Sequence, residues 1–173
     1  NIDTNVPATT EKRDKSPRLA PELESSLKRY GSYTELKRAA LIIAAAQTDK
    51  RSVKKLREEF LKIDTDASGT INEKELCAAL GVAELDTPTK DVFAKLDHDR
   101  SGEVHYHEFL AATLEAHELL NEEVLQDTFD RMDHDDSGVI SRENLRSLLG
   151  SRASDELVET LMQDGDLKRN GHV

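Results

Sequence analysis

The sequence contains no tryptophan, a single cysteine and few aromatic residues, which make up 4% of its 173 residues. Because Cys77 has no second cysteine to pair with, nothing supports a small secreted fold held by internal disulfides. The longest apolar run, residues 39–46, is far too short to span a bilayer and lies too deep in the chain for the core of a signal peptide. We therefore expect a cytoplasmic protein, with any membrane attachment supplied by segments outside this chain.

Positive charge is scarce overall and unevenly distributed. The net charge of −11 argues against nucleic acid as the main partner, because that binding depends on neutralising phosphates with Lys and Arg. Residues 1–60 carry 13 basic and 9 acidic residues, whereas residues 61–173 carry 11 basic and 26 acidic ones. These two segments therefore have net charges of +4 and −15, and the basic residues are densest between residues 28 and 57. This asymmetry suggests that the acidic half has a partner within the same chain.

The N-terminal third is divided into a polar tail and a helical region. Residues 1–18 hold two of the four prolines and show no apolar period, so we interpret them as a linker or tail. From Leu19 onward, apolar residues recur at helical spacing until Gly31 interrupts them. The segment Ser32-Tyr33-Thr34-Glu35 then matches a capping box, in which Ser32 and Glu35 would begin a new helix. Residues 19–50 therefore form either one long helix that contains a glycine or two helices that meet near residue 31.

A fourfold repeat follows residue 50. Four acidic, glycine-containing loops begin at Asp64, Asp97, Asp133 and Asp166, with separations of 33, 36 and 33 residues. Apolar residues at helical spacing flank the loops, and the equal outer separations are typical of two tandem pairs. We expect an all-α chain with two lobes, residues 51–117 and 118–173.

The first two loops have the residue types that a calcium ion requires. They read DTDASGTINEKE from Asp64 to Glu75 and DHDRSGEVHYHE from Asp97 to Glu108. Both fit the twelve-residue EF-hand loop, with oxygen ligands at positions 1, 3, 5, 7, 9 and 12 and a turn glycine at position 6. The glutamate at position 12 begins the exit helix, so it couples ion binding to the position of that helix. The residues at position 8, Ile71 and Val104, are predicted to pair as short antiparallel strands.

The third and fourth loops depart from this pattern. In the third, Asn144 offers one neutral oxygen where glutamate would offer two charged ones, so we expect weaker Ca²⁺ binding or occupancy by Mg²⁺. The fourth stops at position 8 and has Lys168 at position 3, which leaves its metal binding open. Ile140 and Val173 can still pair the two loops structurally. The pattern positions are Asp133, Asp135, Ser137, Val139 and Asn144 in the third loop, and Asp166, Asn170 and His172 in the fourth.

Six histidines also raise the possibility of zinc. His98 and His134 occupy position 2 of their loops, which points outward, and His105 at position 9 would ligate at most through water. Two strings, beginning at His107 and His117, start like a zinc-protease helix but have no second histidine four residues later. Ordinary surface or half-buried histidines are the favoured interpretation.

Residues 27–46 have two possible roles. They could form a solvated basic helix, or a basic amphipathic helix lying in a hydrophobic groove that the loops open on binding calcium. The second is favoured, because Tyr30 and Ile43 are 13 residues apart, as end anchors would be, and because flexible methionine, typical of promiscuous grooves, is nearly absent. The predicted contact residues are Leu27, Tyr30, Leu36, Ala40 and Ile43.

Residues 52–173, which end in LVETLMQDGDLKRNGHV, resemble calmodulin. The preceding LKRYGSYTELKRAALIIAAAQ, running into LREEFLKIDTD, resembles the junction segment of calcium-dependent protein kinases, plant and protist kinases with a built-in calmodulin-like domain. The resemblance implies a two-lobe EF-hand fold preceded by a long junction helix. It also implies ten calcium ligands in the first two loops: Asp64, Asp66, Ser68, Thr70, Glu75, Asp97, Asp99, Ser101, Glu103 and Glu108.

In that family the junction helps to hold an upstream kinase domain inactive, and calcium relieves the inhibition by letting the EF-hands engage the junction. We find no Gly-rich phosphate loop, His-Arg-Asp loop or Asp-Phe-Gly motif, so we expect regulation rather than catalysis from this chain. Its expected partners are its own junction helix and an upstream Ser/Thr kinase domain. The alternatives are a free-standing calcium sensor or adaptor that binds helices of other proteins, and a membrane-associated protein that uses residues 28–57 as a basic surface helix.

Overall fold

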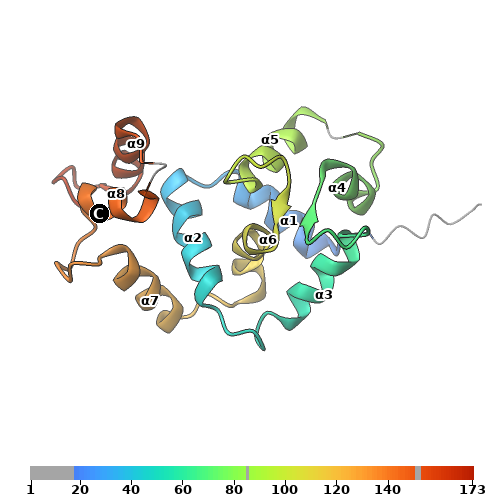
Figure 1. The fold of residues 1–173 in the computed structure, drawn as a ribbon, viewed down its shortest axis with the longest axis horizontal. Helices are drawn as coiled ribbons and strands as arrows, with labels where there is room; N and C mark the ends of the chain where they lie inside the picture. Colours follow the sequence, from blue (N-terminus) through green and yellow to red (C-terminus); the bar gives the residue numbers. More distant parts are fainter. Residues whose placement is uncertain (1–17, 85, 151–152) are drawn as a thin grey trace, which may run out of the picture.

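A computed structural model describes residues 18–84, 86–150 and 153–173 (Figure 1). Over these residues the chain is all-α with one short strand pair, which confirms the predicted EF-hand fold class. No helix among them is both long and apolar enough to cross a bilayer. The elements are α1 (Pro21–Gly31), α2 (Glu35–Gln47), α3 (Lys54–Ile63), β1 (Thr70–Ile71), α4 (Glu73–Leu80), α5 (Thr87–Leu96), β2 (Val104–His105), α6 (Tyr106–Thr113), the 3₁₀ helix η1 (Glu115–His117), α7 (Glu122–Met132), α8 (Arg142–Leu149) and α9 (Asp155–Gly165).

The junction region consists of two helices rather than one long helix. The predicted capping box at Ser32 is wrong by two residues: Thr34 caps α2 by accepting a hydrogen bond from the Lys37 amide. Ser32 is unavailable as the cap because its hydroxyl donates to the Arg29 carbonyl at 2.6 Å and so closes the last turn of α1. The Glu35 side chain pairs with Arg38 instead of turning back to the helix start.

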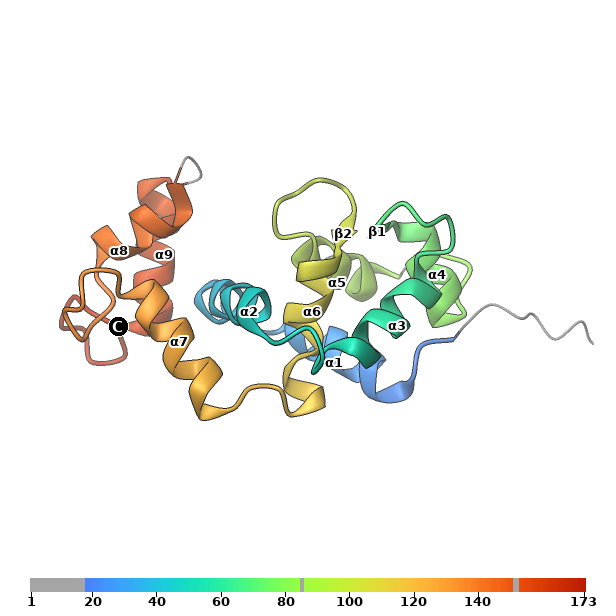
Figure 2. The ribbon, with the colours of Figure 1, turned by 60° about the horizontal axis from the view of Figure 1, so that its bottom comes forward.

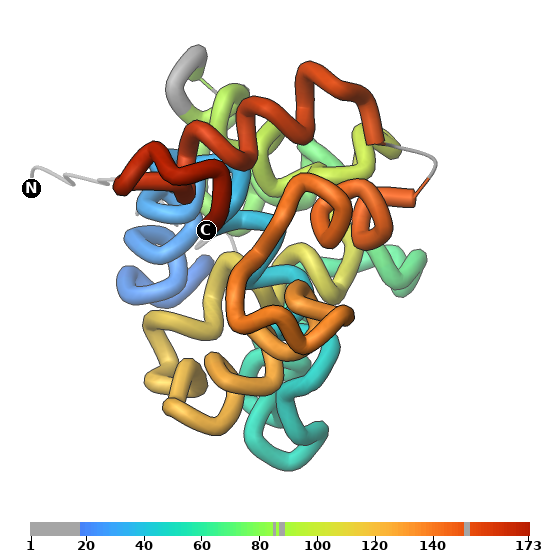
Figure 3. Tube along the Cα trace, turned by 90° about the vertical axis from the view of Figure 1, so that its left-hand side faces the viewer, coloured from blue at the N-terminus to red at the C-terminus, as the bar shows by residue number. Residues whose placement is uncertain are grey.

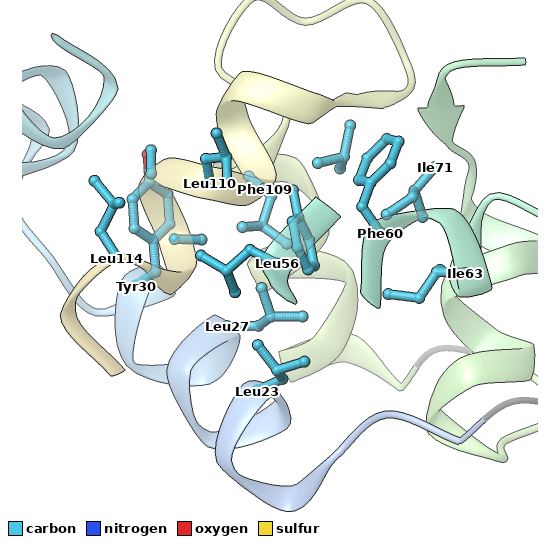
Figure 4. Packing of buried hydrophobic residues seen from close by; sticks show 14 of the residues in the cluster. Leu23, Leu27, Tyr30, Leu56, Phe60, Ile63, Ile71, Phe109, Leu110 and Leu114 are labelled. Carbon is cyan, nitrogen blue, oxygen red and sulfur yellow. The ribbon is translucent and has the colours of Figure 1, made fainter. Parts of the chain in front are cut away.

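The first lobe encloses α1. Helices α3 to α6 surround this helix, and its apolar face lies inside their core (Figure 4). Leu23, Leu27 and Tyr30 are at most 4% exposed and belong to the same cluster as Phe60 and Phe109. The Ser26 hydroxyl also donates to a carbonyl of α6, that of Ala112, at 2.7 Å. Since burying an apolar side chain contributes about 1.5–3 kcal/mol, these three residues make α1 an integral part of the lobe.

The second lobe holds α2. Helices α7 to α9 form a separate core around Leu145, Leu161 and Met162, and the apolar face of α2 packs against it. The opposite side of α2 contacts α6 of the first lobe. Figure 2 shows α2 lying between the two lobes, and in Figure 3, where the second lobe is nearest the viewer, the blue and cyan junction lies behind it. The second half of the junction therefore connects the lobes.

Candidate metal-binding loops

The first loop is closed by its position-12 carboxylate. Glu75 lies in the first turn of α4, and one of its oxygens, Oε2, accepts from the Asn72 amide at 3.1 Å in a capping box. The other oxygen, Oε1, faces the loop and accepts from the amides of Thr65 at 2.8 Å and Asp66 at 3.4 Å. Gly69, with φ of 88°, makes the turn that brings these groups together.

The second loop repeats this arrangement through the same two carboxylate oxygens of its position-12 residue. Glu108, which is fully buried, accepts through Oε2 from the His105 amide at 2.8 Å. Its Oε1 accepts from the amides of His98 at 2.7 Å and Asp99 at 3.2 Å. At position 1, both carboxylate oxygens of Asp97 accept from loop amides, as those of Asp64 do in the first loop.

The two loops are joined as predicted. Strands β1 and β2 are antiparallel, with Ile71 opposite Val104 and Thr70 opposite His105. The Thr70 hydroxyl also donates to the Glu103 carboxylate at 2.7 Å. Binding at one loop can therefore be transmitted to the other through this short ladder.

The residues of both loops fit a hard cation. Carboxylate oxygens of Asp64, Asp66 and Glu75 lie within 4.8 Å of one another, and Asp64 and Glu75 are at most 7% exposed. Within the described ranges no Lys or Arg forms an ion pair with any of these three carboxylates. Hydrogen bonds from Ser68 lower the pKa of Asp66, so this side chain remains anionic. Converging, unpaired carboxylates are the donor set that Ca²⁺ prefers.

His105 lies beside two carboxylates of the second site. Its Nδ1 atom is 3.7 Å from Asp99 Oδ2 and 3.6 Å from Glu108 Oε2, and these three residues form a second group able to hold a cation. The EF-hand pattern predicts that His105 ligates a cation at most through water. Its location agrees with position 9 of that pattern, to which the sequence already assigned it.

The third loop has a different interior, because Asn144 turns an amide nitrogen toward it. Asn144 Nδ2 lies 3.1 Å from Asp135 Oδ1 and 2.9 Å from His134 Nδ1. The hydrogen bond from Asn144 lowers the pKa of Asp135 to about 2. An NH₂ group is a donor and cannot ligate a cation, so these residues do not fit Ca²⁺ in this arrangement. His134 is exposed, as predicted for position 2, but nothing in the pattern indicated its contact with Asn144.

The fourth loop is curled around Asp166, whose carboxylate accepts from the amides of Asn170 at 2.9 Å and Gly171 at 2.6 Å. Lys168 and His172 are exposed. The predicted pairing with the third loop is confirmed by two main-chain hydrogen bonds between Ile140 and Val173, of 2.8 and 3.0 Å.

The five predicted junction contacts divide between the lobes. Leu27 and Tyr30 lie in the first core, whereas Leu36, Ala40 and Ile43 pack against the second. Tyr30 and Ile43, expected as anchors at the two ends of one groove, therefore belong to different lobes. Because these apolar faces are covered, residues 28–57 do not form the free amphipathic helix that the membrane alternative requires.

Comparison with known proteins agrees with this geometry. A family model described as an EF-hand domain pair matches residues 32–114, and one described as an EF hand matches residues 125–149. The chain therefore belongs to the EF-hand proteins, and within them it is related to the calmodulin-like domains of calcium-dependent protein kinases.

Three calcium-dependent protein kinases are among the relatives of this chain. Calcium-dependent protein kinase 2 of Zea mays is 35% identical over 86% of this chain and 30% of its own length. Calcium-dependent protein kinase 7 of Oryza sativa subsp. japonica is 31% identical over 90% of this chain and 29% of its own length. Calcium-dependent protein kinase 9 of Arabidopsis thaliana is 32% identical over 86% of this chain and 28% of its own length. The chain thus spans less than a third of the length of these relatives.

Proposed function

We propose that this chain is the calcium-sensing regulatory segment of a Ser/Thr protein kinase, and that calcium at the first two loops changes how the first lobe holds the junction. The observation that carries the proposal is the position of Glu108. This side chain closes the second loop and lies in the first turn of α6, a helix that contacts both α1 and α2.

The path from loop to junction is short. Phe109 follows Glu108 directly and packs in the same core as Leu27 and Tyr30 of α1. One turn after Glu108 on α6, the carbonyl of Ala112 accepts the Ser26 hydroxyl. When bound, Ca²⁺ supplies the positive charge that the clustered loop carboxylates lack. Any shift of Glu108 that accompanies binding moves α6, and with it the surface that α1 and α2 occupy.

Two features support an internal target over an adaptor role. The core of the first lobe is filled by α1 of the same chain, and the related proteins named above are kinases that contain more than this segment. We therefore propose an upstream kinase domain as the regulated partner. A kinase domain in the native polypeptide N-terminal to this segment would support this part of the proposal, and its absence would favour the free-standing sensor.

The switch can be tested on the whole chain by amide hydrogen exchange in EGTA and in Ca²⁺. We expect calcium to change the exchange of α1 amides, and the double variant Glu75→Gln/Glu108→Gln to lose that change, because affinity depends on the charge of the ligands. Glu73→Gln is the matched control, since Glu73 is an exposed carboxylate in the same turn of α4 as Glu75. Calcium binding without any change in α1 exchange would contradict the proposed coupling of the loops to the junction. No calcium binding at all would contradict the proposed calcium-sensing role.

A further inference from the structure

Position 12 has the same two contacts in the first two loops, and the third loop reverses one of them. In the first two, an outer oxygen caps the exit helix while an inner oxygen accepts from the amides of positions 2 and 3. In the third, Asn144 Oδ1 caps α8 by accepting from the Ser141 amide at 2.8 Å. The inner atom, Nδ2, donates to the side chains of positions 2 and 3, His134 and Asp135.

The orientation of this amide is determined by its surroundings. A main-chain N–H at 2.8 Å requires an oxygen as its acceptor, so the Asn144 oxygen must face Ser141 and the NH₂ group must face the loop. The Ser141 hydroxyl lies 2.6 Å from the same oxygen. Asn144 is 1% exposed, so turning the amide over to present its oxygen to a cation would place its NH₂ group against the Ser141 N–H, which is also a donor.

The second lobe is otherwise fully assembled on α2. The third and fourth loops are joined at Ile140 and Val173, and Asp164 of α9 accepts the main-chain amide of Glu35 at 3.0 Å. Gly165 lies so close to α2 that a Cβ atom there would overlap the Leu36 side chain. These contacts hold the start of α2 without involving either of the cation-fitting loops.

We infer that the third loop is a metal-free hand, closed by the hydrogen bonds from Asn144 to His134 and Asp135, which keeps the second lobe attached to α2 with or without calcium. The inference rests on the proposed function in one respect: if calcium changes the first lobe, the second lobe stays bound to α2 during that change. The lobe that holds α1 then responds to calcium, whereas the lobe that holds α2 keeps its contact with the junction in both states.

Asn144→Asp is the sharpest variant, because it keeps the capping oxygen and the size of the side chain but replaces the inner NH₂ donor by a carboxylate oxygen facing Asp135. In EGTA, we expect amide exchange across residues 133–144 to be about 10- to 100-fold faster than in the wild type, since the loop loses the donor of the buried Asn144 side chain and gains a like charge beside Asp135. Added Ca²⁺ or Mg²⁺ should slow this exchange again. Asn121→Asp is the matched control, because Asn121 caps α7 in the same lobe and an acidic cap is favourable there.

The wild-type chain should show unchanged exchange over residues 133–144 when EGTA is replaced by Mg²⁺ or Ca²⁺, and titration calorimetry should find one more calcium site in Asn144→Glu than in the wild type. Cation-dependent protection of residues 133–144 in the wild type, or an Asn144→Asp chain as protected in EGTA as the wild type, would each overturn the inference. If calcium also leaves the first two loops unchanged, the proposed function fails, while the comparison in EGTA still decides whether Asn144 closes the third loop.

Discussion

The ammonium group of Lys95 donates to the main-chain carbonyl of Gly31 at 2.6 Å. Gly31 is the last residue of α1, whose final carbonyls have no partner within the helix, and Lys95 lies two residues before the first ligand position of the second loop. The bond therefore joins the end of the enclosed junction helix to the helix that leads into a metal-binding loop. A cation at this position is also favourable for the helix dipole.

Replacing Lys95 by methionine should loosen this connection. The substitution Lys95→Met keeps most of the apolar stem but removes the charged donor, so we expect the free energy of unfolding to fall by about 1 kcal/mol. Urea denaturation measures the change. Lys90→Met, at another exposed lysine of α5, should change the stability by less than about 0.5 kcal/mol. Equal effects of the two substitutions would show that the bond to Gly31 contributes nothing.

Gly31 itself is required for close packing and not for an unusual backbone angle. A Cβ atom at this position would lie 2.9 Å from Val92 Cγ2, and valine has little rotamer freedom with which to move away. We expect Gly31→Ala to destabilise the chain by about 1–2 kcal/mol through overpacking.

The double variant Gly31→Ala/Val92→Ala tests that explanation. Because Val92→Ala removes the methyl group that the new Cβ would meet, the double variant should be more stable than the sum of the two single changes predicts. Additive effects in a double-mutant cycle would mean that the cause lies elsewhere.

The hydroxyl of Tyr30 is buried and, among the described residues, has no hydrogen-bond partner. Burial also raises the pKa of this side chain well above its usual range. Tyr30→Phe keeps the ring and its edge contact with Tyr33, so it should raise the free energy of unfolding by about 1 kcal/mol. Tyr30→Ala should lower it by about 3–5 kcal/mol by leaving a cavity. A loss of stability in Tyr30→Phe would indicate that the hydroxyl does have a partner.

Tyr33 should make stability depend on alkaline pH. Burial, and then its hydrogen bond to Glu115, raises the pKa of Tyr33 from 10.0 to about 12. Because the raised pKa favours the protonated folded form, this stabilisation is complete below pH 10 and is lost as the pH rises toward 12. Tyr33→Phe should flatten this part of the profile, measured as urea stability at a series of pH values.

Glu115 gives the opposite dependence at acidic pH. The hydrogen bond from Tyr33 lowers the pKa of Glu115 below 4.5, so its contribution is present above that pH and disappears as the pH falls below it. Glu115→Gln should remove the acidic dependence while retaining an acceptor for Tyr33. A pH profile identical to that of the wild type in both variants would exclude the pair as a source of either dependence.

The sequence could predict the features that depend on local spacing. The two regular loops, the pairing at Ile71 and Val104, and the all-α class follow from residue types at defined intervals, because an EF-hand loop places its residues by local backbone geometry. The capping box failed for a related reason. Ser32 and Thr34 are both suitable caps, and which one is used depends on where α1 ends.

For the third loop, the sequence pattern was not sufficient to predict the orientation of the position-12 side chain. Asn144 marked a weaker site in the sequence, but the outward or inward direction of its amide depends on Ser141, His134 and Asp135 together. Similarly, no pattern indicated that Val92 would contact Gly31, 61 positions earlier in the chain.

By itself, the sequence determined which loops carry the carboxylates that a cation requires, since those residues stand at defined positions wherever the loops lie. It also indicated that the basic junction and the acidic loops belong together. Only the tertiary structure decided how they meet: Leu27 and Tyr30 enter one lobe, and Leu36, Ala40 and Ile43 pack on the other. The physical reason is that this division depends on packing between segments distant in the chain, and the same apolar spacing would fit one long groove or two short ones.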